Sequence, residues 1–230
     1  LTRASARSGA RGKGSKWSEY DFASWCAVWL LYLVEFSDWD SQSKIGRGYV
    51  DSNSSAISSG GTDSMTYHTG RAAGTNGKTA VQYRHIENPY GNVFEWIDGI
   101  NFSDGTVYVC LNPASYADDT ATNYTNIGSK IQSDGYITAI GVASAMPWAF
   151  YPTAVGGSET TYIPDYAYYY SGWRVLHVGG NWNNGGNAGL FYFNANNSSS
   201  DSNSNVGARP LVFLLTRAGF PAPLGENIAA

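Results

Sequence analysis

Short amide side chains are concentrated near the C-terminal end of the sequence. Between Asn181 and Asn205 the chain holds nine Asn, five Ser, three Gly and one Asp. An Asn side chain offers two donor hydrogens and an acceptor oxygen on a short stem, so it can bind backbone or sugar groups, and aromatic rings add contact area. We therefore predict a ligand-binding surface composed of Asn181, Trp182, Asn183, Asn184, Asn187, Tyr192, Asn194, Asn196, Asn197, Asn203 and Asn205, with Trp182 and Tyr192 as aromatic anchors.

The same composition is typical of a solvated loop or linker. The pattern around it favours a folded surface instead. GGNWNN follows a predicted strand, GLFYF interrupts the polar segment as a buried strand would, and GARPLVF closes it with another strand. A linker has no need of such strands, so we expect apolar residues to form a scaffold beneath the amides: Leu190, Tyr192 or Phe193, Val206, Leu211 and Phe213.

Cysteine and histidine offer less chemistry. Cys26 lies inside an apolar run, so we expect a small buried side chain, and whether it pairs with Cys110 is open. Three histidines at positions 68, 85 and 177 lack the HxxxH or HExxH spacing of zinc enzymes and are expected to be core or surface residues. We predict no catalytic residue and no cofactor.

Charge limits the partners and the metals. The chain has 14 Lys and Arg against 18 Asp and Glu, a net charge of −4, so no clustered basic face for nucleic acid is expected. Calcium requires several carboxylate and amide oxygens at one point, and Asp201 is the only acidic residue from 179 to 210. We therefore predict no metal site.

The elements that must position the amides begin with a helix. The apolar run FASWCAVWLLYLV follows Ser18-Glu19-Tyr20-Asp21, which has the capping-box form, and predicts a helix from Ser18 to about Phe36. Its apolar part is shorter than the ~20 residues of a membrane span, so a buried helix is favoured over a membrane span. Residues 1–16 are expected to be a flexible basic arm or linker, 17–217 the ligand-binding domain with its variable part at about 179–210, and 218–230 a C-terminal tail.

Strands are predicted for the remaining apolar segments. Alternation and turn residues indicate strands at 81–86, 93–99, 106–111, 173–178, 188–193 and 211–215. Residues 37–78 have no periodicity and predict a surface loop, and 136–171, with Pro and Gly among aromatic residues, predict packed irregular structure. The fold class expected is α+β, with an early buried helix, an irregular antiparallel sheet and long loops.

Several strings carry a family resemblance. GNVFEW (91–96), RVLHVGGNWNN (174–184) and GAR (207–209) resemble the GNVWEW, RVLRGGSW and G-F-R signatures of the formylglycine-generating, sulfatase-modifying branch of the C-type lectin fold. YLVEFSDWDSQSKIG, VQYRHIENPYGNVFEWIDGI and AVGGSETTYI resemble lectin-fold proteins common in phages and prophages. Within that fold, 179–210 is similar to the variable region of proteins diversified by retroelements, including phage tail receptor-binding proteins of the major-tropism-determinant type.

The resemblance implies a C-type-lectin-like fold and a non-enzymatic protein that binds a protein or glycan receptor on a host cell. It also implies a location on a phage tail or a bacterial surface, and a homo-oligomer, often a trimer. In retroelement systems Asn codons are the richest source of substitutions, which accounts for the Asn content. Two alternatives remain: a structural virion or surface component, and a sulfatase-modifying enzyme with altered chemistry. The oxidase itself uses two cysteines in the C-terminal part, and here no cysteine follows Cys110.

Overall fold

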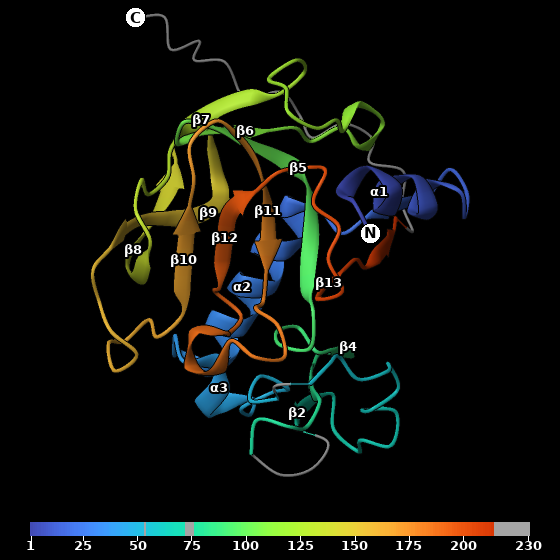
Figure 1. Ribbon diagram of the computed structural model, residues 1–230, viewed down its shortest axis with the longest axis vertical. Coiled ribbons are helices and arrows are strands. Elements are labelled where there is room, and N and C mark those ends of the chain that lie inside the picture. The colour runs from blue at the N-terminus through green and yellow to red at the C-terminus, as the bar shows by residue number, and fades with distance from the viewer. Residues whose placement is uncertain (53, 72–75, 214–230) are drawn as a thin grey trace, which may run out of the picture.

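A large twisted sheet with one long helix behind it makes up most of the structure, a computed structural model that describes residues 1–52, 54–71 and 76–213 (Figure 1). The strand order of this sheet is β7-β6-β5-β11-β12-β10-β8-β9, and β13 pairs with β5. Two small sheets, β1-β14 and β2-β3-β4, lie outside it. The strands of the large sheet are β5 (Phe94–Ser103), β6 (Thr106–Val109), β7 (Thr125–Ser129), β8 (Gly135–Ala143), β9 (Met146–Val155), β10 (Tyr166–Tyr169), β11 (Trp173–Val178), β12 (Phe193–Asn197) and β13 (Val206–Gly207).

The remaining elements are short apart from two helices. The helices are α1 (Arg3–Arg11), α2 (Phe22–Phe36) and α3 (Ser41–Lys44), with 3-10 turns at Pro113–Ser115 and Gly185–Asn187. The strands of the small sheets are β1 (Trp17–Glu19), β2 (Thr69–Arg71), β3 (Val81–Tyr83), β4 (Ile86–Glu87) and β14 (Pro210–Val212). The described part of 37–78 is largely loop, as predicted.

The large sheet curls until its two edge strands approach each other. The amide of Ile131, just after β7, donates to the carbonyl of Pro152 in β9 at 3.2 Å. The Tyr151 hydroxyl donates to the carbonyl of Ile127 in β7 at 3.1 Å. The sheet is therefore a nearly closed, barrel-like structure, and the predicted α+β class is confirmed.

The predicted irregularity of residues 136–171 is wrong. This segment forms β8, β9 and β10, and β8 and β9 make the hairpin at the sheet edge. The register between them shifts at several points, and Pro152 lies inside the ladder opposite Ile140. Bulges accommodate proline and glycine in a strand, so these residues do not exclude a sheet. The sheet is also not purely antiparallel, because β10–β12 and β5–β13 are parallel pairs.

Helix α2 begins one turn later than the sequence predicts. Asp21, not Ser18, is the N-cap, and its carboxylate accepts a hydrogen bond from the amide of Ser24 at 2.9 Å. Ser18 lies in β1, where it pairs with Leu211 of β14. Strand pairing with a distant segment therefore overrides the capping-box pattern, because the backbone of β1 is already committed to extended geometry.

Aromatic side chains join α2 to the sheet. The rings of Trp25 and Phe193 lie 6.0 Å apart, those of Trp29 and Phe191 lie 4.6 Å apart, and all four are buried. Trp29 Nε1 also donates to the carbonyl of Leu190 at 2.8 Å. GLFYF is thus buried as predicted, although the strand that contains its end, β12, starts only at Phe193. Helix α2 and GLFYF make the central core.

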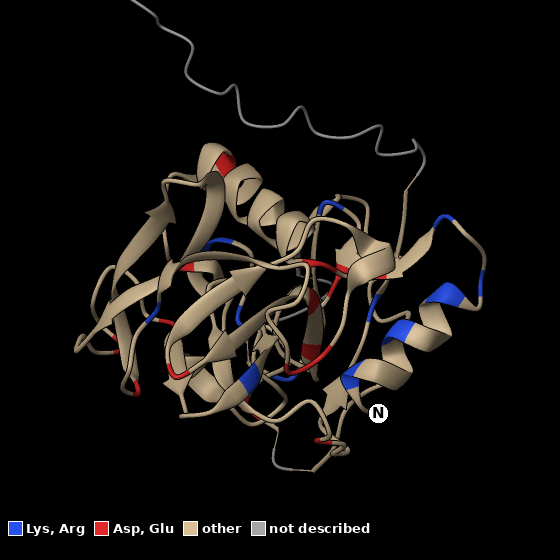
Figure 2. Ribbon diagram, turned by 90° about the horizontal axis from the view of Figure 1, so that it is seen from above, with Lys and Arg blue, Asp and Glu red and all other residues tan. Residues whose placement is uncertain are grey.

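Residues 1–16 are not a free arm. Arg3 and Arg7, on one face of α1, are buried against β5. Arg3 Nε donates to Asp118 at 2.7 Å, and Arg7 Nε donates to Asp98 at 2.6 Å. Figure 2 shows the basic residues of α1 along this helix. The basic spacing that indicated a solvated arm is the spacing of a helix held by buried ion pairs.

Other strand predictions fit to different degrees. The strand at 173–178 matches β11, and 93–99 and 106–111 match most of β5 and β6. The 81–86 segment is divided between β3 and β4 by a turn at Arg84 and His85, both with positive φ. The 211–215 strand is β14 as far as Val212, and the tail predicted for 218–230 lies outside the described residues.

Among the described helices, none combines the length and apolar character that a membrane span requires.

Candidate functional site

The motif strings that carry the family resemblance meet in space. Strands β5 and β11 pair antiparallel, with His177 opposite Trp96, so GNVFEW and RVLHV are neighbours. The amide of Gly91 donates to the carbonyl of Gly179 at 3.0 Å, which joins the other ends of the two strings. Arg209 of GAR forms an ion pair with Glu95 of GNVFEW. The GNVFEW, RVLHV and GAR strings, which lie between residues 91 and 209 in the sequence, therefore form one structural unit.

The predicted asparagine positions differ widely in exposure. Asn181, Tyr192 and Asn194 are buried, at 3%, 1% and 5% relative exposure. Asn183 and Asn203 are exposed, and Trp182, Asn184, Asn187, Asn196, Asn197 and Asn205 are half-buried. The eleven residues do not form one outward patch. In Figure 1 the 3-10 turn at 185–187 lies beside α3, whereas the chain after β12 returns towards α1 and β13.

Residues 181–187, the asparagine turn, are largely held by their own amides. The Asn184 side-chain oxygen accepts from the amide of Asn181 at 2.8 Å, and the Asn181 oxygen accepts from the amide of Asn183 at 3.1 Å. The Trp182 backbone bonds to Asn92 and Ser52. Asn181 and Asn184 therefore use their oxygens to fix the turn, which leaves the exposed Asn183 as the amide of this turn most available to a ligand.

A polar cleft of about 500 Å³ lies beside this turn, between α3 and residues 159–164. Gln42, Arg47, Glu159, Thr160 and Gly186 are among the residues that line it. The cleft brings donors, acceptors and both signs of charge to one concave surface, which can form several hydrogen bonds to a polar ligand.

Arg47 is fixed in the cleft wall. Its Nε and one terminal nitrogen donate to the two Asp51 oxygens at 2.8 and 3.0 Å, and the other nitrogen donates to Gln42 Oε1 at 2.9 Å. Hydrogen bonding to Asp51 raises the pKa of Arg47, so the group stays charged. Gln42 Nε2 in turn donates to the carbonyl of Gly185 at 3.1 Å. This chain of contacts ties the asparagine turn to α3 and orients the cleft.

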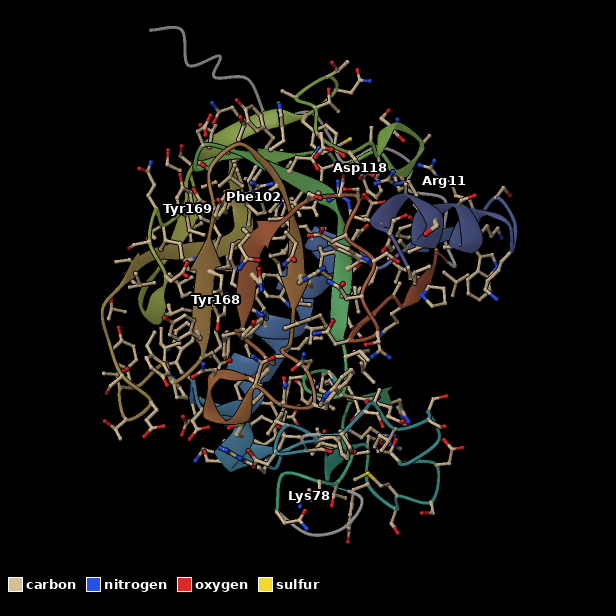
Figure 3. All side chains as sticks on the ribbon, in the orientation of Figure 1. Arg11, Lys78, Phe102, Asp118, Tyr168 and Tyr169 are labelled. Atoms are coloured by element: carbon tan, nitrogen blue, oxygen red, sulfur yellow. The ribbon has the colours of Figure 1, made fainter. Side chains whose placement is uncertain are left out.

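A row of tyrosines begins beside the asparagine turn and crosses the sheet. Ring centroids are 5.0 Å apart for Tyr136 and Tyr166, 4.7 Å for Tyr166 and Tyr168, and 5.8 Å for Tyr168 and Tyr192. The Tyr136 hydroxyl donates to Asn187 Oδ1 at 2.7 Å, which connects the row to the asparagine turn. Figure 3 labels Tyr168 on β10. Tyr136, Tyr166 and Tyr168 are half-buried, so part of each side chain remains accessible to a ligand.

Sequence reasoning missed these three tyrosines. We predicted irregular structure for YAYYY (166–170), but its alternation of large and small side chains was a usable signal of a strand. In the structure Ala167 is fully buried between Tyr166 and Tyr168 on β10. In a strand, successive side chains point to opposite faces. The small residue thus faces the core and both tyrosines face outwards.

The asparagine side chains of β12 form hydrogen bonds inside the protein. Asn197 Nδ2 lies 3.1 Å from His177 Nδ1 and donates to Asn194 Oδ1, also at 3.1 Å. His177 is buried and stacks on Phe94 with centroids 5.3 Å apart. Burial lowers the pKa of His177 to about 3, so its ring is neutral and can accept at Nδ1. Asn194 is therefore part of a buried polar network rather than of an exposed surface, because β12 lies in the interior of the sheet.

The last predicted residues lie far from the cleft. The backbone amide of Phe94 donates to the carbonyl of Asn205 at 2.8 Å. The backbone amide of Val206 donates to the carbonyl of Asn203 at 3.3 Å. The neighbouring Ser202 hydroxyl accepts from the amino group of Leu1, so this segment runs alongside α1. Asn203 is exposed but belongs to another part of the surface than Asn183 and Asn187.

Thiol chemistry has little support. Cys26 and Cys110 are both free and buried. Burial raises the pKa of each thiol, which disfavours the reactive thiolate. Within the described residues, no group of three or more His, Cys, Asp or Glu side chains is placed to hold a metal ion.

No protein-family model and no curated protein matches this chain.

Proposed function

We propose that this chain is a non-enzymatic ligand-binding protein that uses the polar cleft and the tyrosine row as its binding surface. One observation carries the proposal: Gly186 of the asparagine turn and the fixed Arg47 line one cleft of about 500 Å³, and Asn187, next to Gly186, accepts a hydrogen bond from the Tyr136 hydroxyl at the start of the tyrosine row. The ligand is polar, since the cleft offers paired donors and acceptors, and tyrosine rings contribute area beside it. A glycan or a polar protein loop has this chemistry.

A C-type-lectin-like fold is part of the proposal. It is supported by the meeting of the GNVFEW, RVLHV and GAR strings and by the Arg209–Glu95 ion pair. From that resemblance we infer display on a phage tail or bacterial surface and a receptor on a host cell. The buried thiols weigh against a sulfatase-modifying enzyme, because thiolate formation at either cysteine is unfavourable.

A binding experiment tests the site. The purified chain is applied to glycan arrays and to panels of fixed bacterial cells, and bound cells are then treated with periodate or with protease to distinguish a glycan from a protein receptor. Asn187→Ala and Tyr166→Ala are expected to weaken binding at least about 10-fold, as removal of a central contact does. Asn203→Ala is the matched control, because this exposed amide lies outside the cleft.

The outcomes separate the proposal from its competitors. Equal loss in the control and in the Asn187 and Tyr166 variants would show that the cleft and the tyrosine row are not the site. The diversification claim has its own test in the source genome. A second near-copy of the segment encoding 181–205, differing mainly at template adenines beside a reverse transcriptase gene, is expected, and its absence would remove that claim alone.

A further inference from the structure

The polar cleft has an excess of negative charge. Asp40 and Glu159 line it, and Arg47 is the only basic residue among the described residues that line it. The Arg47 guanidinium donates to both oxygens of Asp51, so its positive charge is already compensated. Three carboxylates, those of Asp40, Asp51 and Glu159, therefore stand against one guanidinium, which leaves two negative charges at the cleft. A cleft of one sign of charge concentrates ligands of the opposite sign.

Neither Asp40 nor Glu159 is paired with a cation of the described part of the chain. Asp40 accepts from the amide of Ser43 at 3.0 Å as the N-cap of α3, and this bond does not neutralise its charge. Glu159 is exposed and has no hydrogen bond or ion pair among the described residues. Lys44, the basic residue of α3, is paired with Asp38 at 3.1 Å instead. Both carboxylates can therefore accept a cation from a ligand.

Glu159 lies where the cleft meets the tyrosine row. A Cβ atom on Gly186 would be 3.7 Å from Oε2 of Glu159 and 3.7 Å from a terminal nitrogen of Arg47, so both charged groups face the same point of the asparagine turn. Burial, and next the charge of Glu159, raise the pKa of Tyr136, because this carboxylate also lies near the first ring of the row. A cation bound by Glu159 is thus close to a tyrosine ring, and the face of such a ring attracts positive charge.

Arg47 adds hydrogen-bond donors at the same place. A guanidinium has five N–H groups, and three of those of Arg47 donate to Asp51 and Gln42. The other two have no acceptor among the described residues, so they can donate to a neutral carbonyl oxygen of a ligand. The cleft therefore suits a ligand that brings a cation and a carbonyl group together.

A protein loop supplies both groups. Its lysine and arginine side chains carry their charge at the end of a long flexible stem, and its peptide units supply carbonyl oxygens. Sugars offer mainly neutral hydroxyl groups, and acidic sugars carry the same sign of charge as Asp40 and Glu159. Like charges that are brought together weaken binding. The charge of the cleft therefore favours a basic protein loop over a glycan.

We propose that the ligand of the cleft is a protein loop that inserts a lysine or arginine side chain beside Glu159 and Asp40. A backbone carbonyl of the same loop accepts from Arg47, and the stem of the basic side chain packs against the ring of Tyr136. Because the cleft is the ligand site under the proposed function, on which this assignment rests, its ligand is narrowed from a polar group to a cationic one. Acidic loops and acidic glycans are rejected at this site.

NMR titration of the isotope-labelled full chain with blocked tripeptides tests the preference for positive charge. A glycine–lysine–glycine peptide is expected to shift the amide signals of Thr160 and Gly186, which line the cleft. The same peptide with Nε-acetyl-lysine has lost its charge and is expected to bind about 5-fold more weakly, the upper range for one exposed ion pair. A glycine–glutamate–glycine peptide is expected to cause no shift up to about 20 mM.

Substitutions of Glu159 test the role of its carboxylate. Glu159→Gln is expected to weaken binding of the lysine peptide about 5-fold, and Glu159→Lys is expected to abolish it and to admit the glutamate peptide. Asp63→Asn is the matched control, because Asp63 is an exposed acid that does not line the cleft, and it is expected to bind like the wild type. The amide signals of residues far from the cleft verify that each variant retains the fold.

Three outcomes would contradict the basic loop. Equal affinity for the lysine and acetyl-lysine peptides, or a Glu159→Gln variant that binds like the wild type, would overturn the proposal. Signal shifts caused by glucosamine but not by the lysine peptide would assign the cation to an amino sugar and overturn it as well. Cell binding that depends on Asn187 and Tyr166 but not on Glu159 would contradict the charge preference alone, whereas cell binding indifferent to all three would contradict the proposed function itself.

Discussion

Glu19 is a buried carboxyl group whose protonation should control how stability depends on pH. It is 1% exposed, and neither carboxyl oxygen has a hydrogen-bond partner. Burial, and next the neighbouring carboxylate of Asp98, raise the pKa of Glu19 to about 9, although Arg3 and Arg7 act in the opposite direction. At neutral pH the folded protein therefore holds a proton on Glu19 that the unfolded chain releases.

The sign of the pH dependence follows from that proton. The folded pKa lies above the ordinary value of 4.5, so the folded state binds more protons between pH 4.5 and about 9. The contribution of Glu19 to the free energy of unfolding is therefore constant below pH 4.5. It decreases as the pH rises from 4.5 towards 9. The slope is at most about 1.4 kcal/mol per pH unit, which gives a penalty of about 3 kcal/mol at pH 7.

Glu19→Gln removes this penalty, because the amide resembles the protonated acid in shape and is neutral at every pH. We expect the variant to match the wild type near pH 4.5 and to exceed its unfolding free energy by up to about 3 kcal/mol at pH 7, with a wider gap at pH 8.5. Urea denaturation followed by tryptophan fluorescence at these three pH values measures the gap.

A matched control separates burial from net charge. Glu159→Gln changes the formal charge equally at an exposed position. A Glu19→Gln gap that stays constant from pH 4.5 to 8.5, or that Glu159→Gln reproduces, would refute the reasoning that Glu19 is protonated in the folded protein.

Three further perturbations test other parts of the structure. Arg7→Met leaves the buried Asp98 carboxylate without its bidentate partner and should lower the unfolding free energy by about 3–5 kcal/mol; a loss below about 1 kcal/mol in urea denaturation would mean that α1 is not held by this pair. Gly91→Ala should cost at least about 1 kcal/mol in the same assay, because φ is +74° and the new Cβ would lie 2.8 Å from the carbonyl of Tyr49; an unchanged midpoint would contradict that geometry. The imidazole of His177 should show no NMR titration between pH 8 and 5, since burial lowers its pKa to about 3, and a midpoint near 6.5 would show that the ring is accessible to water.

The sequence led to part of the candidate site and missed the rest. It identified the asparagine turn, of which Gly186 lines the cleft. It did not indicate that Asn194 is buried, because a polar residue inside a sheet is recognised only from its partners, here His177 and Asn197. It also gave no indication of Arg47, whose position depends on contacts with Gln42 and Asp51.

The sequence by itself determined the elements whose signals are local. The continuous apolar run specifies α2, with Asp21 as a nearby cap, and the apolar GLFYF within a polar segment specifies burial, since these properties depend on neighbouring residues alone. Tertiary structure decided the features that depend on distant partners. Helix α1 is docked because Arg3 and Arg7 meet acids about 90 to 115 positions away, and β8 to β10 become strands only by pairing with each other and with β12. Ion pairs and strand ladders form between segments that only folding brings together, so no local pattern in the sequence specifies them.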